Sequence, residues 1–161
     1  YGYFLTVRVP LMNYTLCFLI NESEVLMLLR ANEPNKGKWN GVGGKIEFNE
    51  TPKESCTREV LEETGLKLKN PLFRGMIALN GIECIYVYAS SDFEGDLISS
   101  DEGMLEWKKL DWILSSKEVV GNIPFFIEDV LNFTSEPKVY DCSYSESGEL
   151  LGGQVKSLQA I

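Results

Sequence analysis

The sequence predicts a mixed α/β fold, because strand-like and helix-like segments alternate along the chain. Two pairs of β-rich runs each surround a turn, residues 14–20 with 24–30 and residues 72–79 with 83–89. The second turn contains Asn80-Gly81, a strong hairpin signal. Between the two pairs lies a segment with clear helix signals at both ends. We therefore expect strands and helices to share one core.

The expected helix covers residues 52–64. Thr51 can cap its first turn, Pro52 suits the first helical position, and Glu54 completes a capping box. Gly65 can take the left-handed conformation that commonly ends a helix. These local signals give both boundaries of the helix.

The other segments complete the α/β pattern. Residues 31–40 are polar and are expected to form a loop, and the glycines at 41–44 mark a tight turn or a close backbone approach. We further expect a strand at residues 105–110, helices at 111–116 and 124–133, and a last hairpin from residues 138–143 and 150–158.

The chain of 161 residues has the size of one domain and shows no interdomain linker. We expect residues 12–161 to form that domain and residues 1–11 to be a leader or a loosely attached arm. Residues 1–11 lack the charged start and cleavage site of a signal peptide. The apolar run at residues 14–20 is too short to cross a bilayer, so no membrane association is expected.

The net charge of −9 and the pI of about 4.6 argue against nonspecific binding of a nucleic-acid polymer, which needs a basic surface. A phosphate-bearing small molecule is still compatible with this charge. Divalent cations can lie between phosphates and carboxylates and balance both.

The residues available for catalysis are limited, because the chain contains no histidine. This excludes Ser-His-Asp and Cys-His catalysis and every histidine metal site. The four cysteines are scattered without a CxxC pair, which favours reduced thiols and a cytoplasmic location. Acid–base chemistry must therefore come from carboxylates, lysine, tyrosine or metal-bound water.

Three glutamates, Glu59, Glu62 and Glu63, share one face of the expected helix. Like charges at this spacing destabilise an isolated helix, and Arg58 is the one compensating cation nearby. Carboxylates gathered beside a glycine-rich turn can coordinate a hard cation such as Mg²⁺, which prefers oxygen ligands. The alternative is the solvated acidic face of an ordinary surface helix.

A longer pattern separates these two interpretations. Its nine specified positions are Gly44, Glu50, Arg58, Glu59, Val60, Glu62, Glu63, Gly65 and Leu66. Their spacing resembles the Nudix box at every fixed position, and a chance match of this length is rare. The resemblance implies a strand–loop–helix–loop motif at residues 44–66 within a Nudix α/β/α sandwich that has a mixed sheet.

The resemblance also implies roles for individual residues. Glu59, Glu62 and Glu63 are similar to metal ligands, the carbonyl of Gly43 to a backbone ligand, and Glu50 to a further outer carboxylate. Arg58 resembles the residue that orients the glutamates by ion pairing. The implied cofactor is Mg²⁺, with Mn²⁺ as a substitute.

Residues 39–45 resemble the segment before the box in MutT-type members of the family. The resemblance implies that Asn40 contacts the base of a nucleotide, although it could also cap its loop. Glu102, followed by Trp107, resembles a late glutamate of the metal site and is a candidate ligand or general base. The alternative for Glu102 is an ordinary turn carboxylate.

Three further residues are candidates for substrate binding. Asn122 lies before two phenylalanines, where this branch places a residue that reads the purine edge, but it could equally be a helix N-cap. Arg30 and Lys45 could contact phosphate oxygens, or could be exposed cations at strand ends.

The resemblance implies an enzyme that hydrolyses a nucleoside triphosphate to the monophosphate and pyrophosphate, with 8-oxo-dGTP or a related damaged purine as the expected substrate. Glu59, Glu62 and Glu102 compete for the role of general base. Other Nudix substrates, such as ADP-ribose and dinucleoside polyphosphates, and a non-catalytic sensor stay as alternatives. The chain could be a monomer or a homodimer.

Overall fold

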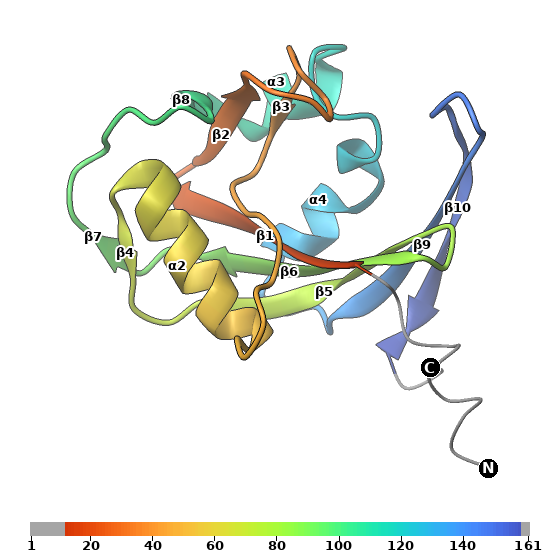
Figure 1. The fold of residues 1–161 in the computed structure, drawn as a ribbon, viewed down its shortest axis with the longest axis horizontal. Helices are drawn as coiled ribbons and strands as arrows, with labels where there is room; N and C mark the ends of the chain where they lie inside the picture. Colours follow the sequence, from red (N-terminus) through yellow and green to blue (C-terminus); the bar gives the residue numbers. More distant parts are fainter. Residues whose placement is uncertain (1–11, 159–161) are drawn as a thin grey trace.

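The computed structural model describes residues 12–158, so the predicted leader at residues 1–11 lies outside the described residues. The strands are β1 (Met12–Asn21), β2 (Glu24–Arg30), β3 (Trp39–Asn40), β4 (Lys67–Leu68), β5 (Leu72–Leu79), β6 (Glu83–Ser90), β7 (Phe93–Glu94), β8 (Gly103–Lys109), β9 (Lys138–Tyr144) and β10 (Leu150–Ser157). The helices are α2 (Pro52–Thr64), α3 (Leu110–Ser115) and α4 (Ile123–Leu131). Figure 1 shows how these elements are arranged.

The main sheet has eight strands in the order β10-β9-β5-β6-β1-β2-β3, with β8 also paired to β2. The pairs β1–β6 and β5–β9 are parallel, whereas the other pairs are antiparallel. The sheet is therefore mixed, as the sequence predicted. Among residues 12–158, no helix is long and apolar enough to span a bilayer.

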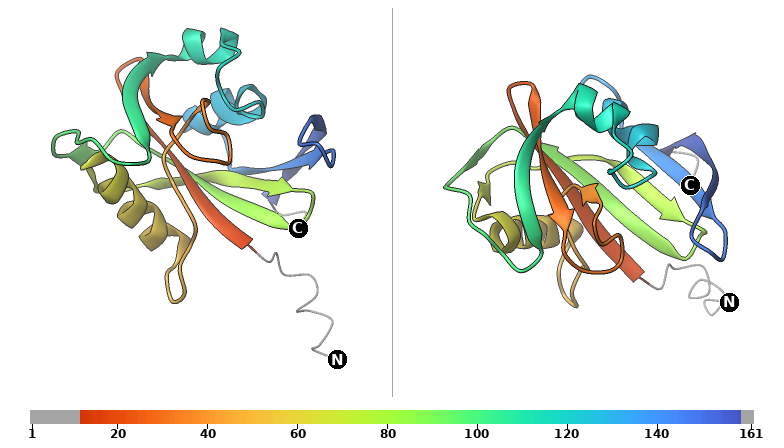
Figure 2. Two further views of the ribbon diagram at one scale, coloured as in Figure 1. Left: turned by 45° about the horizontal axis from the view of Figure 1, so that its top comes forward. Right: turned by 90° about the horizontal axis from the view of Figure 1, so that it is seen from above.

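The central strand β1 is buried on both faces, which explains the apolar run at its centre, residues 16–20. Leu16 and Phe18 face a core that includes α3 and α4, whereas Cys17 and Leu19 face a second core beneath α2. This alternation follows from the two-residue period of a strand. Figures 1 and 2 show α2 on one side of β1 and the helices α3 and α4 on the other.

The separation of β1 from β2 positions the site. The two strands pair only next to their turn, at Ile20↔Val25 and Asn21↔Glu24, after which β2 pairs with β8 and β3 instead. The freed edge of β1 is occupied by the glycine-rich segment. The Thr15 amide donates to the Gly44 carbonyl at 2.8 Å, and Cys17 and Val42 exchange two backbone hydrogen bonds.

Most predicted elements are confirmed, and their ends differ by one or two residues. The helix α2 begins and ends at the predicted residues, and the three hairpins are present. One expectation was wrong: the predicted loop at residues 31–40 ends in the short strand β3, which pairs with Leu28 and Leu29 of β2. The two-stranded sheet β4–β7 was not predicted.

Candidate active site

The helix α2 holds the glutamates in place through caps at both ends. The Thr51 hydroxyl accepts from the Glu54 amide at 3.1 Å, and the Glu54 carboxylate accepts from the Thr51 amide at 2.9 Å. Gly65 ends the helix with φ of 81°, and its amide donates to the Leu61 carbonyl. The buried Cys56 and Val60 fix the rotation of α2 on the sheet, and this leaves the glutamates on the side of the glycine-rich segment.

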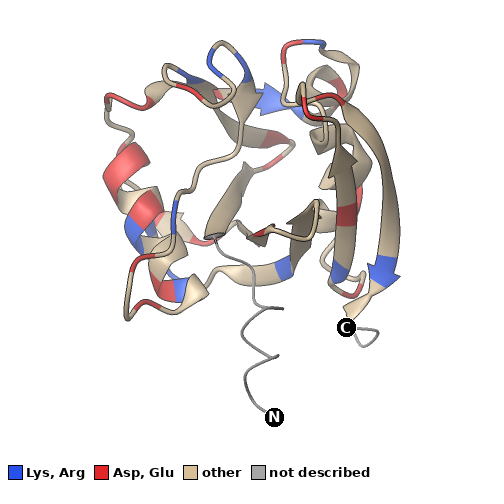
Figure 3. Ribbon diagram, turned by 45° about the vertical axis from the view of Figure 1, so that its right-hand side comes forward, with Lys and Arg blue, Asp and Glu red and all other residues tan. Residues whose placement is uncertain are grey.

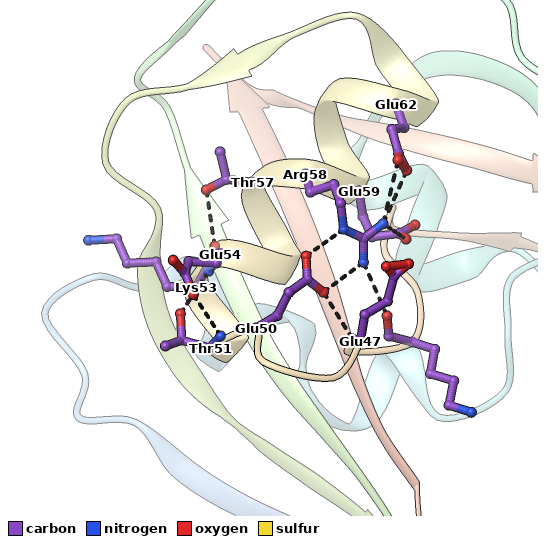
Figure 4. Close-up of polar contacts among 10 residues, drawn as sticks. Glu47, Glu50, Thr51, Lys53, Glu54, Thr57, Arg58, Glu59 and Glu62 are labelled. Atoms are coloured by element: carbon purple, nitrogen blue, oxygen red, sulfur yellow. Dashed lines mark hydrogen bonds and ion pairs between the residues drawn. The ribbon is translucent and has the colours of Figure 1, made fainter.

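Arg58 connects three carboxylates of the motif, as Figure 4 shows. Its guanidinium donates to Glu50 at 2.9 Å, to Glu59 at 2.7 Å and to Glu62 at 3.1 Å. It also donates to the Lys45 carbonyl at 3.3 Å. The hydrogen bond from Arg58 holds the pKa of Glu50 down to about 2. The planar fork of an arginine suits this bridging geometry.

Glu63 is the buried carboxylate of the cluster, with 5% of its surface exposed. Its burial raises its pKa to about 9, helped by a hydrogen bond with Glu59 and by the charges of Glu59 and Glu102. The Gly43 amide donates to Glu63 and partly opposes this shift. Close carboxylates that cannot all ionise are a common property of functional sites.

Gly43 and Gly44 permit the close approach of this segment to β1 and α2. A Cβ atom at position 43 would lie 2.0 Å from the Thr15 carbonyl oxygen. A Cβ atom at position 44 would lie 2.5 Å from a carboxylate oxygen of Glu59. Any side chain here would displace either the strand pairing or the glutamate.

Glu102 comes to the site from a part of the sequence that is distant from α2. It lies directly before β8, and its carbonyl accepts from the Ala31 amide at 3.0 Å, which ties it to the loop after β2. Its own amide donates to the Ser100 hydroxyl at 3.3 Å. The charge of Glu102 acts on Glu63, so the two carboxylates share one site although they are far apart in the sequence.

A pocket of about 440 Å³ opens beside these carboxylates, a size that is typical of small-molecule sites. Seven predicted site residues line it: Arg30, Asn40, Gly43, Lys45, Glu59, Glu63 and Glu102. Four others do not line it: Glu50 and Glu62, which pair with Arg58, then Arg58 itself, and Asn122.

The candidate substrate residues differ in how their side chains are used. The Asn40 side-chain oxygen accepts from the Gly41 amide at 2.8 Å, as a loop-capping asparagine would, while Asn40 also lines the pocket. Arg30 donates to the Pro34 carbonyl at 2.6 Å. Asn122 is the N-cap residue of α4 and is 7% exposed, but its side chain makes no capping hydrogen bond.

The pocket also contains residues that sequence reasoning missed. Six of them come from β1 and from the hairpin of β5 and β6: Tyr14, Thr15, Leu16, Leu79, Glu83 and Ile85. Strand alternation predicts that Glu83 and Ile85 share a face. The sequence did not show that this face opens into the pocket, because that depends on the separation of β1 from β2.

The donor set fits a hard divalent cation. All the candidate ligands offer oxygen, and the charges of Glu59 and Glu102 both act on the buried Glu63. Within residues 12–158, no three acidic side chains are already gathered closely enough to hold an ion. Arg58 draws Glu50, Glu59 and Glu62 to itself, so metal binding would require these side chains to turn.

The Nudix domain family matches residues 10–127, which include all these carboxylates. The chain belongs to the Nudix family. The oxidized purine nucleoside triphosphate hydrolase of Danio rerio is 30% identical over 118 residues, 70% of this chain and 75% of the relative. The mouse hydrolase of the same name is 29% identical over 105 residues, 62% of this chain and 67% of the relative. This chain is thus a Nudix hydrolase.

Solved structures agree with this assignment. The MutT protein of Bacillus halodurans superposes with a TM-score of 0.77 at 29% identity, covering 90% of this chain and 97% of that one. The MutT protein of Methanosarcina mazei gives a TM-score of 0.68 at 27% identity, covering 79% and 97%. The α/β fold with its mixed sheet is therefore the fold of MutT-like Nudix structures.

Proposed function

We propose that this Nudix hydrolase cleaves a nucleoside triphosphate to the monophosphate and pyrophosphate in a Mg²⁺-dependent reaction, with 8-oxo-dGTP or a related damaged purine nucleotide as substrate. The observation that carries the proposal is the composition of the pocket. Glu59, Glu63 and Glu102 line it together with Asn40, Leu79 and Ile85, so one space offers both a polyphosphate site and room for a base. The names of the zebrafish and mouse relatives support this choice of substrate.

The proposed reaction assigns separate tasks to the carboxylates. Glu59, Glu62, Glu63, Glu102 and the Gly43 carbonyl would hold Mg²⁺, and Glu50 would support them from outside. When bound, the cation neutralises phosphate charge and activates water. Arg58 orients Glu50, Glu59 and Glu62 through the hydrogen bonds described above.

The hydrolytic step needs a base that removes a proton from the attacking water. The oxygen of that water forms a bond to one of the two phosphorus atoms that flank the α,β-bridging oxygen. The bond from this phosphorus to the bridging oxygen breaks, which releases the monophosphate and pyrophosphate. Glu59 and Glu102 line the pocket, whereas the Glu62 side chain is 55% exposed and lies outside the lining. This placement favours Glu59 or Glu102 over Glu62 as general base, since a base must reach its proton directly or through one water.

The test is steady-state pyrophosphate release with Mg²⁺, comparing 8-oxo-dGTP with dGTP and the other canonical dNTPs. We expect kcat/KM for 8-oxo-dGTP well above that for dGTP. Equal and feeble rates on every triphosphate would remove the substrate assignment, and the search would move to ADP-ribose and dinucleoside polyphosphates.

Variants of the glutamates test the metal site whichever nucleoside triphosphate proves to be the substrate. Glu63→Gln and Glu62→Gln should lower kcat by orders of magnitude while the fold is kept, because each removes a carboxylate ligand of the proposed metal site. Glu128→Gln, an exposed position on α4, is the matched control and should keep full turnover. Near-normal turnover in both site variants would refute the metal site.

A further inference from the structure

One carboxylate in the pocket is not needed by the proposed hydrolysis. Glu83 lines the pocket from the first residue of β6. The carboxylates whose charges act on the buried Glu63 are Glu59 and Glu102. Glu83 instead interacts with Tyr14, whose phenol hydrogen-bonds to it. Glu83 is thus part of a second polar group in the same pocket.

The strand register defines the surroundings of Glu83. It lies opposite Leu79 across the β5–β6 hairpin, and Tyr14 of β1 lies opposite Ile85. Leu79, Ile85 and Tyr14 also line the pocket. One region of the sheet therefore presents two aliphatic side chains and a phenol around a single carboxylate.

This region has the chemistry of a base-binding site. Aliphatic and aromatic side chains can pack on the flat face of a purine, and a few polar groups fix its orientation. Polyphosphate must lie near Glu59, Glu63 and Glu102, where a cation can balance its charge. The base is then left with the part of the pocket that Leu79, Ile85 and Glu83 line.

We infer that Glu83 is a specificity-determining residue that accepts hydrogen bonds from the guanine-type edge of the substrate base. This inference rests on the proposed function and names the edge that the enzyme reads. An ionised carboxylate offers only acceptors, and it can receive two parallel N–H donors. A guanine edge presents two adjacent donors, the ring N1–H and the exocyclic 2-amino group. An adenine edge presents one donor beside the acceptor N1, which the carboxylate repels.

Tyr14 orients the Glu83 carboxylate through its hydrogen bond. Burial raises the pKa of the Tyr14 phenol, as do the charge of Glu83 and the hydrogen bond to it, so the phenol stays protonated and donates. A donor on one side of the carboxylate leaves its other lone pairs directed to the ligand. We therefore expect Tyr14 to support the base preference without defining it.

The experiment measures dissociation constants of dGMP and dAMP by calorimetry, so that it does not depend on hydrolysis. Wild-type protein should bind dGMP at least tenfold tighter than dAMP. Glu83→Gln should reduce this ratio at least tenfold, because an amide offers one donor and one acceptor and so matches adenine. Tyr14→Phe should keep the order of preference with weaker binding of dGMP. Glu149→Gln, an exposed loop position, removes the same charge and should leave the ratio unchanged.

Each outcome decides between the interpretations. An unchanged dGMP:dAMP ratio in Glu83→Gln, an equal loss for both nucleotides, or a wild-type preference for dAMP would overturn the role of Glu83. An equal loss would indicate a sugar contact. If Glu83→Gln does not fold, the wild-type protein and Tyr14→Phe decide the question. A preference of both proteins for dGMP would support the inference. A preference for dAMP, or no preference, would overturn it. Base-selective binding without hydrolysis of any triphosphate would refute the proposed function alone.

Discussion

Arg58 is the residue that organises the ionic network of the motif. Its guanidinium touches Glu50, Glu59 and Glu62 and also the Lys45 carbonyl. No other side chain in this network is a cation. Metal binding would require these glutamates to turn. Arg58 must therefore hold them in position in the metal-free protein and give up some of its hydrogen bonds to them when the metal binds.

We predict that Arg58→Lys lowers kcat about 10- to 100-fold and raises the Mg²⁺ concentration needed for half-maximal activity. A lysine is a compact charge that cannot bridge three carboxylates in one plane. The measurement is a Mg²⁺ titration of pyrophosphate release. Lys53→Gln, on the exposed first turn of the same helix, is the control. Activity of Arg58→Lys within twofold of wild type would contradict this role.

Glu63 gives a pH-dependent prediction for stability in the presence of a chelator. Its pKa is about 9 in the folded protein against an ordinary value of 4.5. Between these values the folded state binds more protons than the unfolded state, so this group lowers the free energy of unfolding as pH rises toward 9. Glu63→Gln should remove that loss and raise Tm by about 4 °C or more near pH 8.

Thermal melts of wild type and Glu63→Gln at pH 5, 7 and 9 in EDTA would check this. The gap between the two proteins should widen with pH. Glu128→Gln, which changes the same charge at an exposed site, should follow the wild-type curve. If the Tm of Glu63→Gln changes with pH in parallel with the Tm of wild type, then burial of the Glu63 carboxyl does not lower the stability of the fold.

At the scale of elements, the glycine-rich segment and α2 form one unit around the edge of β1. Gly43 lies against the Thr15 carbonyl, where nothing larger fits. Gly43→Ala should therefore lower the free energy of unfolding by about 2 kcal/mol or more, since the backbone must shift. Gly152→Ala in β10, where a Cβ would meet nothing within 4 Å, is the control. Urea unfolding of both variants is the measurement, and equal stabilities would contradict the steric argument.

How much the sequence could predict differs between elements. The helix α2 was predicted to the residue because its signals, Thr51, Pro52 and Gly65, all lie at its two ends and are local in the sequence. The short strands β3, β4 and β7 were not, because each exists only by pairing with a partner that is distant in the sequence. Each of these strands has only two residues, which is too short to show the alternation of apolar and polar residues that predicts a strand.

The same distinction holds for the site. The glutamates of α2 could be grouped from helical spacing, and a family resemblance was needed to add Glu102. Glu83 gave no local signal, because its place in the pocket depends on where β2 leaves β1. Asn122 had a sequence argument, but the structure places it outside the pocket lining.

At the scale of the whole molecule, charged groups have different roles on the two sides of the sheet. In Figure 3 the helix α2, at the left, carries several acidic segments. On the side of the sheet opposite α2, the cations Arg74 and Lys138 connect α4 to the segment that follows it. The buried Arg74 donates to the carbonyls of Val130, Asn132 and Ser135 at 2.7–2.9 Å, which satisfies the end of α4.

Asp129 joins α4 to β9 and gives a prediction for acid stability. Burial raises its pKa, but hydrogen bonds from Lys138, Tyr140 and Ser135 outweigh burial and lower the pKa to about 2, from 3.8. The stabilisation is therefore present above pH 3.8 and is lost as pH falls toward 2. Asp129→Asn should cost about 1–2 kcal/mol at pH 7.

Chemical denaturation at pH 7 and at pH 2.5 would measure this cost, which should shrink in acid. Asp141→Asn is the matched control, because its one ion pair with Lys156 lies on the surface and should contribute little. If Asp129→Asn lowers the free energy of unfolding equally at both pH values, then packing and not charge stabilises the contact between α4 and β9.

The pairing of the glycine-rich segment with β1 also makes the backbone of β1 a built-in reporter. The amides of Thr15 and Cys17 donate to Gly44 and Val42 and not to another strand of the sheet. Their hydrogen–deuterium exchange therefore records how often the segment that carries Gly43 opens. A ligand that orders this segment will slow exchange at these two amides, whether or not it is ever hydrolysed.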